Sequence, residues 1–299
     1  MLIPARSSKT EASAASAPGD AALTRPMARP ETHTMGRVAL TVHDLDRVAA
    51  FYEKAVGLHR LSADGETAIL GAGDRPLLEL RRDPAARRRS PREAGLFHTA
   101  FLLPERGDLG RFLRQALMTR TPLVGASDHS VSEALYLSDP EGNGVEVYAD
   151  RPAATWRRDG DAITMTTEPL DVDDLIAHAS GPAWTGVPDA TRVGHVHLQV
   201  GAIAPAEAFY AGVLGFTITA RYPGGSFFAT DGYHHHLAAN IWNSRGAGVR
   251  TYPSTGLAEV EIALDAARIA AATGEAGGQA PAPAVLSDPW GTAIVLKPR

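Results

Sequence analysis

The sequence contains no cysteine among its 299 residues. Disulfide bonds, thiolate nucleophiles and thiolate-bound zinc are therefore excluded, and any metal ion must be held by nitrogen and oxygen ligands. The sequence also has no apolar run approaching the ~18 residues that a membrane-spanning helix needs. The first 34 residues lack the apolar core of a signal peptide. We therefore expect a cytoplasmic protein that has no membrane partner.

Positive charge is also scarce. Lys and Arg number 29 against 34 Asp and Glu, which gives a net charge of −5, whereas a nucleic-acid-binding domain normally carries a basic stripe. The one dense basic segment, residues 81–92, places its arginines around Pro84 and Pro91, a composition typical of a solvated loop. We therefore expect no nucleic acid as a partner.

One pattern occurs twice along the chain. GRVALTV at 36–42 returns as GHVHLQV at 194–200, and FYEKAVGL at 51–58 returns as FYAGVLGF at 209–216, after the same interval. Each half also closes on an SDPxG turn that is followed by a strand-like segment. A duplicated fold normally carries two equivalent sites, so the polar residues that differ between the copies are informative about function.

Hydrophobic periodicity divides each half into two similar modules. The patterns predict, in every module, a strand, a helix and then two or three further strands. The four leading strands are expected at 38–42, at 96–103, from Val193 and from about Leu257. The expected fold class is therefore α+β, built from four βαβββ modules.

The repeat also predicts a domain organisation. Residues 1–34 are rich in Ala, Ser, Thr and Pro and are expected to form a disordered tail. Modules one and two would form a first domain over 35–150, and modules three and four a second domain over 193–299. The intervening connection, 151–192, is expected to be ordered, with one short helix. A connection of this length is uncommon without a role, and it would allow modules from different halves to pair.

Four longer strings point to a known family. They are GLFHTAFLLPERGDLGRFL, SDHSVSEALYLSDPEGNGVEVYADRP, GHVHLQV and DGYHHHLAANIW. In this order they resemble the vicinal-oxygen-chelate superfamily, which includes glyoxalase I, bleomycin-resistance proteins and extradiol dioxygenases, and within it the catechol-2,3-dioxygenase-like branch. The resemblance spans nearly all of residues 36–299. It implies that the four modules form two incomplete β-barrels.

The resemblance also implies a metal site. Such enzymes hold Fe(II), sometimes Mn(II), with two histidines and one carboxylate, which leaves adjacent positions open for a catecholate and O₂. The family takes ligands from the first and last strands of modules. The matching residues here are His98, Glu146 and His195. Glu259 and Val295 stand where the usual second-half site would have its other ligands, so a site confined to modules three and four is not expected.

Two arrangements of the metal site remain open from the sequence. His98, Glu146 and His195 would meet if modules two and three shared a barrel. Alternatively, a site confined to the first half would use His98 and Glu146 together with Glu79. In either case Glu146 alternates with valines, so its side chain faces away from theirs.

The run at 233–236, Tyr-His-His-His, is a candidate for proton transfer. In the extradiol enzymes a similar turn supplies the histidine that handles the substrate proton, and His235 matches that position. A neutral imidazole near pH 7 can take a hydroxyl proton and return it. Strand alternation would place His234 and His236 on the opposite face.

Four further residues are candidates for the site. His197 shares a strand face with His195 because the two are two residues apart, which makes it a residue of the polar lining. His129 could contact the substrate or orient a ligand. Trp242 and Tyr252 are candidate lining aromatics.

The resemblance and the ligand set together predict an enzyme. We expect an Fe(II)-dependent extradiol dioxygenase that acts with O₂ on a small catechol- or hydroquinone-like aromatic substrate. The alternatives are a glyoxalase-like metal-dependent isomerase or lyase, with Glu79 as an additional carboxylate ligand, and a metal-free protein that binds a small molecule. Family habit suggests a homodimer.

Overall fold

The structure, a computed structural model, describes residues 33–179, 181–274 and 283–299. Strand β1 begins at His33, and His33 and Thr34 already pair with β16. The disordered tail expected over 1–34 therefore wrongly included two residues, His33 and Thr34, that belong to β1. The rest of that expected tail, residues 1–32, lies outside the described residues.

The first half of the chain contains modules one and two. The elements of module one are β1 (His33–Val42), α1 (Leu45–Phe51), a π-helical turn η1 (Tyr52–Val56), β2 (His59–Ala63), β3 (Thr67–Ala72) and β4 (Arg75–Arg82). Those of module two are β5 (Gly95–Leu102), α2 (Arg106–Thr119), β6 (Gly125–Asp128), β7 (Ser132–Ser138) and β8 (Gly144–Asp150). The predicted order of one strand, one helix and two or three further strands is confirmed in both, with three strands after the helix in each.

The second half follows an ordered connection. The elements of the connection are η2 (Ala153–Thr155), β9 (Arg158–Asp159), β10 (Ala162–Ile163), β11 (Glu168–Pro169) and α3 (Val172–Ala177). Module three contains β12 (Arg192–Gln199), α4 (Ile203–Glu207), η3 (Ala208–Val213), β13 (Thr217–Tyr222), β14 (Gly225–Ala229) and β15 (Leu237–Asn240). Module four contains, in its described part, β16 (Gly256–Leu264), α5 (Ala266–Thr273), β17 (Ala284–Ser287) and β18 (Ala293–Pro298).

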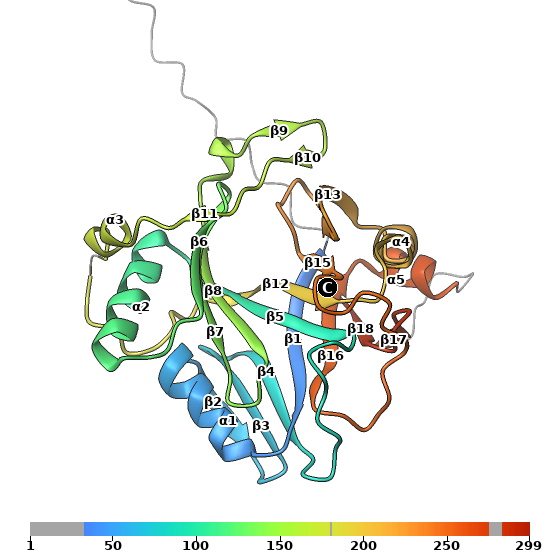
Figure 1. Ribbon diagram of the computed structural model, residues 1–299, viewed down its shortest axis with the longest axis horizontal. Helices are drawn as coiled ribbons and strands as arrows, with labels where there is room; N and C mark the ends of the chain where they lie inside the picture. The colour runs from blue at the N-terminus through green and yellow to red at the C-terminus, as the bar shows by residue number, and fades with distance from the viewer. Residues whose placement is uncertain (1–32, 180, 275–282) are drawn as a thin grey trace, which may run out of the picture. The chain divides into compact units, whose positions relative to one another are not determined.

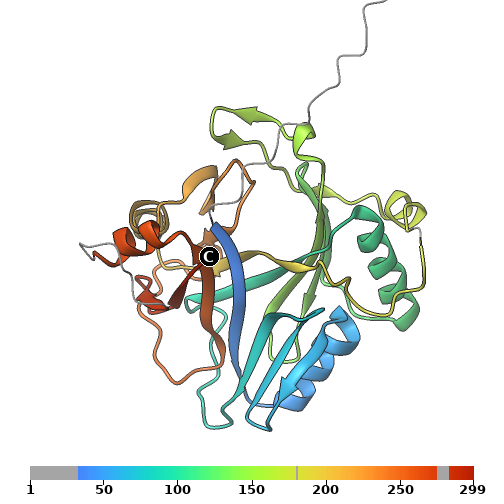
Figure 2. The same ribbon diagram turned by 180° about the vertical axis from the view of Figure 1, so that it is seen from behind.

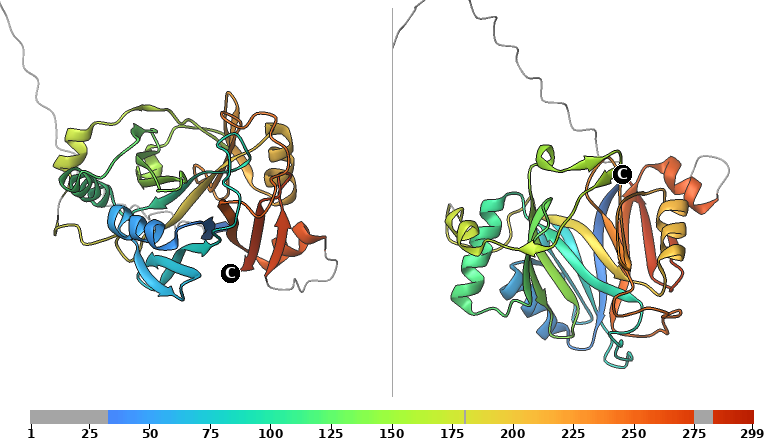
Figure 3. Two further views of the ribbon diagram at one scale, coloured as in Figure 1. Left: turned by 60° about the horizontal axis from the view of Figure 1, so that its bottom comes forward. Right: turned by 45° about the horizontal axis from the view of Figure 1, so that its top comes forward.

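The strands of the modules form two curved sheets (Figures 1 and 3). Within the described ranges, the larger sheet has the order β11-β6-β7-β8-β5-β12-β15-β14-β13, and the smaller one has the order β17-β18-β16-β1-β4-β3-β2. The fold class is therefore α+β, with each sheet curled as an incomplete barrel.

Each sheet combines one module from each half of the sequence. Modules two and three join where β5 pairs antiparallel with β12, and modules one and four join where β1 pairs antiparallel with β16 (Figure 2). The pairing of modules two and three, which the sequence left open, is confirmed. The expected division into 35–150 and 193–299 thus follows the sequence repeat and not the sheets.

The repeated motifs have a structural role that links modules within each half. The hydroxyl of the buried Tyr210, in the second FY motif, donates a hydrogen bond of 2.9 Å to the carboxylate of Asp288 in the SDPxG turn. Tyr52 and Asp139 form the equivalent, longer contact of 3.5 Å in the first half. In each half, the tyrosine of the FY motif thus links a helix to an SDPxG turn.

Local signals set the helix ends. The side chain of Asp44 accepts a hydrogen bond from the backbone N–H of Arg47 and caps α1. Gly57 has a φ of 93° at the end of η1, a left-handed conformation that favours glycine. In the described part of the chain, none of the helices combines the length and apolarity that crossing a membrane requires.

Candidate metal centre

Three polar side chains converge on one face of the larger sheet. They come from adjacent strands: Glu146 from β8, His98 from β5 and His195 from β12. Ala100 explains why they meet, because it pairs with Glu146 on one side and with His195 on the other. His98 lies two residues before Ala100 and therefore on the same face. The small methyl group of Ala100 leaves the space between the strands to the three larger side chains.

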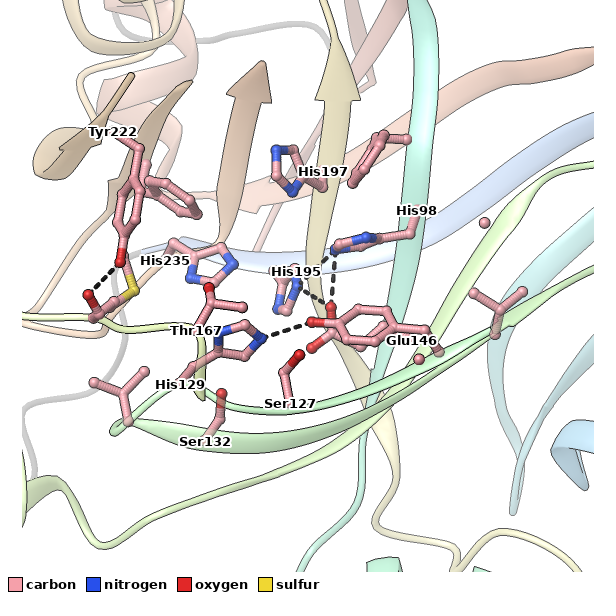
Figure 4. Close-up of a pocket in the computed structure, with 18 of the residues that line it drawn as sticks. His98, Ser127, His129, Ser132, Glu146, Thr167, His195, His197, Tyr222 and His235 are labelled. Atoms are coloured by element: carbon pink, nitrogen blue, oxygen red, sulfur yellow. Dashed lines mark hydrogen bonds and ion pairs between the residues drawn. The ribbon is translucent and has the colours of Figure 1, made fainter. Parts of the chain in front are cut away.

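The three side chains have the spacing of ligands to one ion. Nε2 of His98 lies 2.9 Å from Oε2 of Glu146, and Nε2 of His195 lies 3.2 Å from the same oxygen. The two Nε2 atoms are 3.2 Å apart, and all three residues are buried (Figure 4). Ligands at right angles around an ion with bonds of ~2.1 Å lie about 3 Å apart. Two imidazoles and a carboxylate on one side of an ion suit a non-haem iron site.

The pKa shifts of His195 and Glu146 are also compatible with metal binding. Burial lowers the pKa of His195 to about 4, although the carboxylate of Glu146 opposes this shift. Burial acts to raise the pKa of Glu146, but the charges and hydrogen bonds of His195 and His98 outweigh it, so this pKa lies well below its usual value. A neutral imidazole and an ionised carboxylate are the forms that bind metal ions.

A cavity of about 460 Å³ adjoins the three ligands. Its wall contains Glu146 but, within the described ranges, no Lys, Arg or Asp. Much of the lining is apolar or aromatic, including Phe97, Val131, Tyr136, Tyr222, Phe227 and Trp242. This volume falls within the ~300–1,000 Å³ that is usual for small-molecule sites.

The histidine run splits as the sequence suggested. His235 lines the cavity beside His195, with ring centroids 4.0 Å apart (Figure 4). His234 instead bonds Asp150, and the ring of His236 accepts a hydrogen bond from the backbone of Thr230. All three histidines lie in the irregular segment between the turn at 231–232 and β15, so the division does not come from the strand alternation we expected.

His129 reaches the site together with Tyr136. Nδ1 of His129 lies 2.7 Å from the carbonyl oxygen of Thr166, so Nδ1 must donate. In the neutral ring Nε2 then accepts from the hydroxyl of Tyr136, 2.7 Å away. Burial, and next the charge of Glu146, raise the pKa of Tyr136 well above its usual value. His129 thereby fixes the direction of this phenol within the cavity.

Tyr136 was missed from the sequence, although a signal for it exists. It pairs with Glu146 across the β7–β8 hairpin. The tight turn at 138–144 sets that register, and residues directly opposite on one sheet face are neighbours. Counting outwards from the turn would have placed Tyr136 beside the carboxylate ligand.

The remaining predicted residues divide between the cavity and other places. His197 lines the cavity, as expected, and its Nε2 accepts a hydrogen bond of 2.9 Å from Asn240. Trp242 also lines the cavity. Tyr252 does not, because its ring lies under the guanidinium of Arg250 and its hydroxyl donates to the carbonyl of Gly291. The prediction for Tyr252 was therefore wrong.

Glu79 belongs to the other sheet, on β4. Ion pairs with Arg37 and Arg81 hold its carboxylate there. The group of convergent ligand atoms among the described residues consists of His98, Glu146 and His195, without Glu79. The alternative of a site confined to the first half was therefore wrong.

The smaller sheet repeats the arrangement around Ala100 without its ligands. Ala39 pairs with Glu79 on β4 and with Glu259 on β16. Arg37, two residues before Ala39, takes the place that His98 has beside Ala100. A guanidinium and its carboxylate partners thus occupy the equivalent position.

The connection between the halves also forms part of the cavity. Met165 and Thr166 line it, together with Thr167 (Figure 4). The hydroxyl of Tyr222 donates to the carbonyl of Met165, and β10 contacts β13. The connection therefore serves as a cavity wall, a role its length suggested but its composition did not reveal.

This fold is of the vicinal-oxygen-chelate type, and His98, Glu146 and His195 could form a metal site in it. The sequence matches the Glyoxalase/Bleomycin resistance protein/Dioxygenase superfamily over residues 34–147 and 192–277, and the chain belongs to that superfamily. It is 41% identical over 239 residues to the Catechol-2,3-dioxygenase of Bacillus subtilis (strain 168), covering 78% of this chain and 83% of that protein.

Solved structures support the fold at low sequence identity. Glyoxalase I from Zea mays has a TM-score of 0.53 and 17% identity, with 90% of this chain and 93% of that chain covered. The cppA protein from Streptococcus pneumoniae TIGR4 has a TM-score of 0.54 and 11% identity, with 89% and 99% covered. At these identities the likeness concerns the fold alone.

Proposed function

We propose that this protein is an Fe(II)-dependent extradiol dioxygenase that opens a catechol- or hydroquinone-like ring. The observation that carries the proposal is the set of two imidazoles and one carboxylate, which converge from one side beside an aromatic-lined cavity. The relative named Catechol-2,3-dioxygenase adds support. The ring carbon–carbon bond beside the diol breaks, and both atoms of O₂ enter the product, so no external reductant is needed.

In this proposal His98, Glu146 and His195 hold the metal ion. Bound there, Fe(II), or Mn(II) in its place, would supply adjacent open positions for the diol and O₂ together with redox chemistry. All three side chains project from one sheet face and line the cavity, so a substrate in the cavity would lie beside an ion that they hold.

His235 acts as the proton carrier. It lies at the cavity wall next to His195, and burial, with the neighbouring histidines, lowers its pKa well below the usual value. The ring is therefore neutral at pH 7 and can accept a proton from a diol hydroxyl. The hydroxyl of Tyr136, oriented by His129, and the ring of His197 position the substrate. The aromatic walls exclude water around it.

The two alternatives have less support. A glyoxalase-like isomerase or lyase would favour a fourth protein ligand, yet the convergent group among the described residues has three members and Glu79 is held elsewhere by arginines. A metal-free binding protein would have no use for two buried imidazoles that face a carboxylate. The homodimer and the cytoplasmic location stay predictions.

The test is oxygen consumption. The protein is loaded with Fe(II) under anaerobic conditions and mixed with catechol and a panel of substituted catechols and hydroquinones. We expect O₂ uptake stoichiometric with substrate and the appearance of a ring-opened chromophore. Confirmed iron binding without uptake across the panel would refute the dioxygenase, and absence of iron binding would favour the metal-free binding protein.

A further inference from the structure

A buried chain of hydrogen bonds leads away from the cavity behind His235. Nδ1 of His235 lies 2.8 Å from Nδ1 of His234, and Nε2 of His234 lies 2.8 Å from Oδ1 of Asp150. Asp150 is the last residue of β8, four residues after Glu146 on the same strand. Within the described residues, His235 has a hydrogen-bond partner at Nδ1. Nε2 is therefore the ring nitrogen available to a substrate in the cavity.

The chain fixes where the ring protons are. A carboxylate accepts hydrogen bonds and cannot donate, so Nε2 of His234 carries a proton toward Asp150. In the neutral ring of His234, Nδ1 then has a lone pair and must accept. The donor to it is Nδ1–H of His235. The neutral ring of His235 consequently has its lone pair on Nε2.

We propose that Asp150 and His234 are positioning residues that hold His235 in the tautomer protonated at Nδ1, with the lone pair of Nε2 toward the substrate. The catalytic meaning of this inference rests on the proposed function, because His235 is the proton carrier there. The tautomer itself does not depend on any activity. Among the described residues, His234 is not part of the cavity lining, and its side-chain hydrogen bonds go to His235 and Asp150. Its effect on the substrate therefore passes through His235.

Packing keeps His234 in the required orientation. It is fully buried, with the ring of Tyr233 4.1 Å and the ring of Trp156 5.2 Å away between centroids. The hydroxyl of Tyr233 also donates to the second oxygen of Asp150 at 2.9 Å. Trp156 belongs to the connection between the halves, which therefore buries this chain as well as lining the cavity. Because the ring is fully buried between these neighbours and its two partners, rotation that would reverse its hydrogen bonds is opposed.

The direct test is the tautomer of His235 in the metal-free, full-length protein, measured by ¹⁵N NMR with ¹⁵N-labelled histidine. The His235 signals are assigned by their loss in His235→Gln. We expect a protonated Nδ1 and an unprotonated Nε2 in the natural protein. In His234→Phe, which keeps a ring but removes both hydrogen bonds, we expect a mixture that contains the Nε2–H tautomer. A wild-type His235 protonated at Nε2, or an unchanged tautomer in His234→Phe, would overturn the proposal.

A matched control separates this effect from disturbed packing. His236→Phe makes the same substitution two residues further along, outside the chain, and should leave the His235 tautomer unchanged. His234→Gln keeps one donor for Asp150 and one acceptor for His235, so it should restore the natural tautomer. A tautomer that also changes in His236→Phe would show a packing effect and refute the assignment.

The same variants extend the test to turnover. In Fe(II)-loaded protein, His234→Phe should lower kcat, by about 10–100-fold if the effect equals that of losing an outer partner of a metal-ligating histidine. KM should change little, and His234→Gln should recover kcat. Equal kcat in all variants would refute the positioning role. If wild-type protein shows the tautomer but consumes no O₂ with any diol, the proposed function fails while the positioning stands.

Discussion

His98 on β5 pairs in register with His197 on β12, yet its Nε2 lies 3.2 Å from Nε2 of His195, two residues earlier along that strand. The contact is diagonal, and diagonal neighbours on one face are within reach of long side chains. It brings together side chains that the sequence separates by 97 positions. The directly opposed His197 is turned instead toward Asn240.

Metal binding should require both halves of the sequence. His98→Ala and His195→Ala should each abolish binding of one divalent ion, because each removes one of three protein ligands. Glu79→Gln should leave the affinity unchanged, since its carboxylate lies in the other sheet. Isothermal titration with Mn(II) or anaerobic Fe(II) measures this. Retained stoichiometry in His195→Ala would point to a site that needs the first half alone.

A second prediction concerns the space above Ala100. Ala100→Val adds two methyl groups between Glu146 and His195, so it should weaken metal binding at least about 10-fold and destabilise the fold by about 1–3 kcal/mol through overpacking. Ala39→Val is the matched control, because Ala39 has the equivalent place in the smaller sheet. It should destabilise the fold by a similar amount without affecting metal affinity.

Both quantities are measurable on the same samples. Chemical denaturation gives the free energy of unfolding, and titration with the metal gives the affinity. If Ala39→Val and Ala100→Val weakened metal binding alike, the loss would reflect general distortion. The spacing argument for the ligands would then be wrong.

The sequence was sufficient to predict the three convergent candidate ligands but not the residues around them. His98, Glu146 and His195 stand at positions within repeated strands, and local patterns predict such strands well. Which strands pair across the molecule is decided by long-range packing, so the joining of β5 and β12 could only be left open. Asp150 acquires its place through neighbours on other strands, and nothing in its local sequence distinguishes it. Tyr136 could have been placed opposite Glu146 by counting outwards from the turn at 138–144.

Acid should destabilise the metal-free protein through buried histidines. Burial, with nearby His234, His33 and Arg192, lowers the pKa of His236 to about 3, against ~6.5 in an unfolded chain. As the pH falls below about 6.5, the unfolded chain takes up a proton that the folded one does not. The free energy of unfolding should therefore fall, by about 1.4 kcal/mol per pH unit for this residue.

His236→Phe provides the check on that origin. Phenylalanine does not titrate, so the decline in stability between pH 6 and pH 4 should be shallower by up to about 1.4 kcal/mol per pH unit. Denaturation at a series of pH values gives both slopes. Identical slopes in the variant and the natural protein would show that His236 binds protons equally in the folded and unfolded states, and the prediction would fail.

The charge of the substrate should affect kcat/KM because the described cavity wall contains no Lys or Arg. With no Lys or Arg among the described lining residues, a substrate carboxylate would be desolvated without a partner and would face Glu146. A neutral substrate such as 4-methylcatechol should therefore have a kcat/KM at least about 10-fold above that of 3,4-dihydroxybenzoate.

Val124 lines the cavity and is largely exposed, so a charge is tolerated there. Val124→Lys should raise kcat/KM for the carboxylate substrate, whereas the neutral control Val124→Gln should not. Equal kcat/KM for both substrates in the natural protein would show that the carboxylate stays in solvent, outside the cavity, and would contradict the prediction.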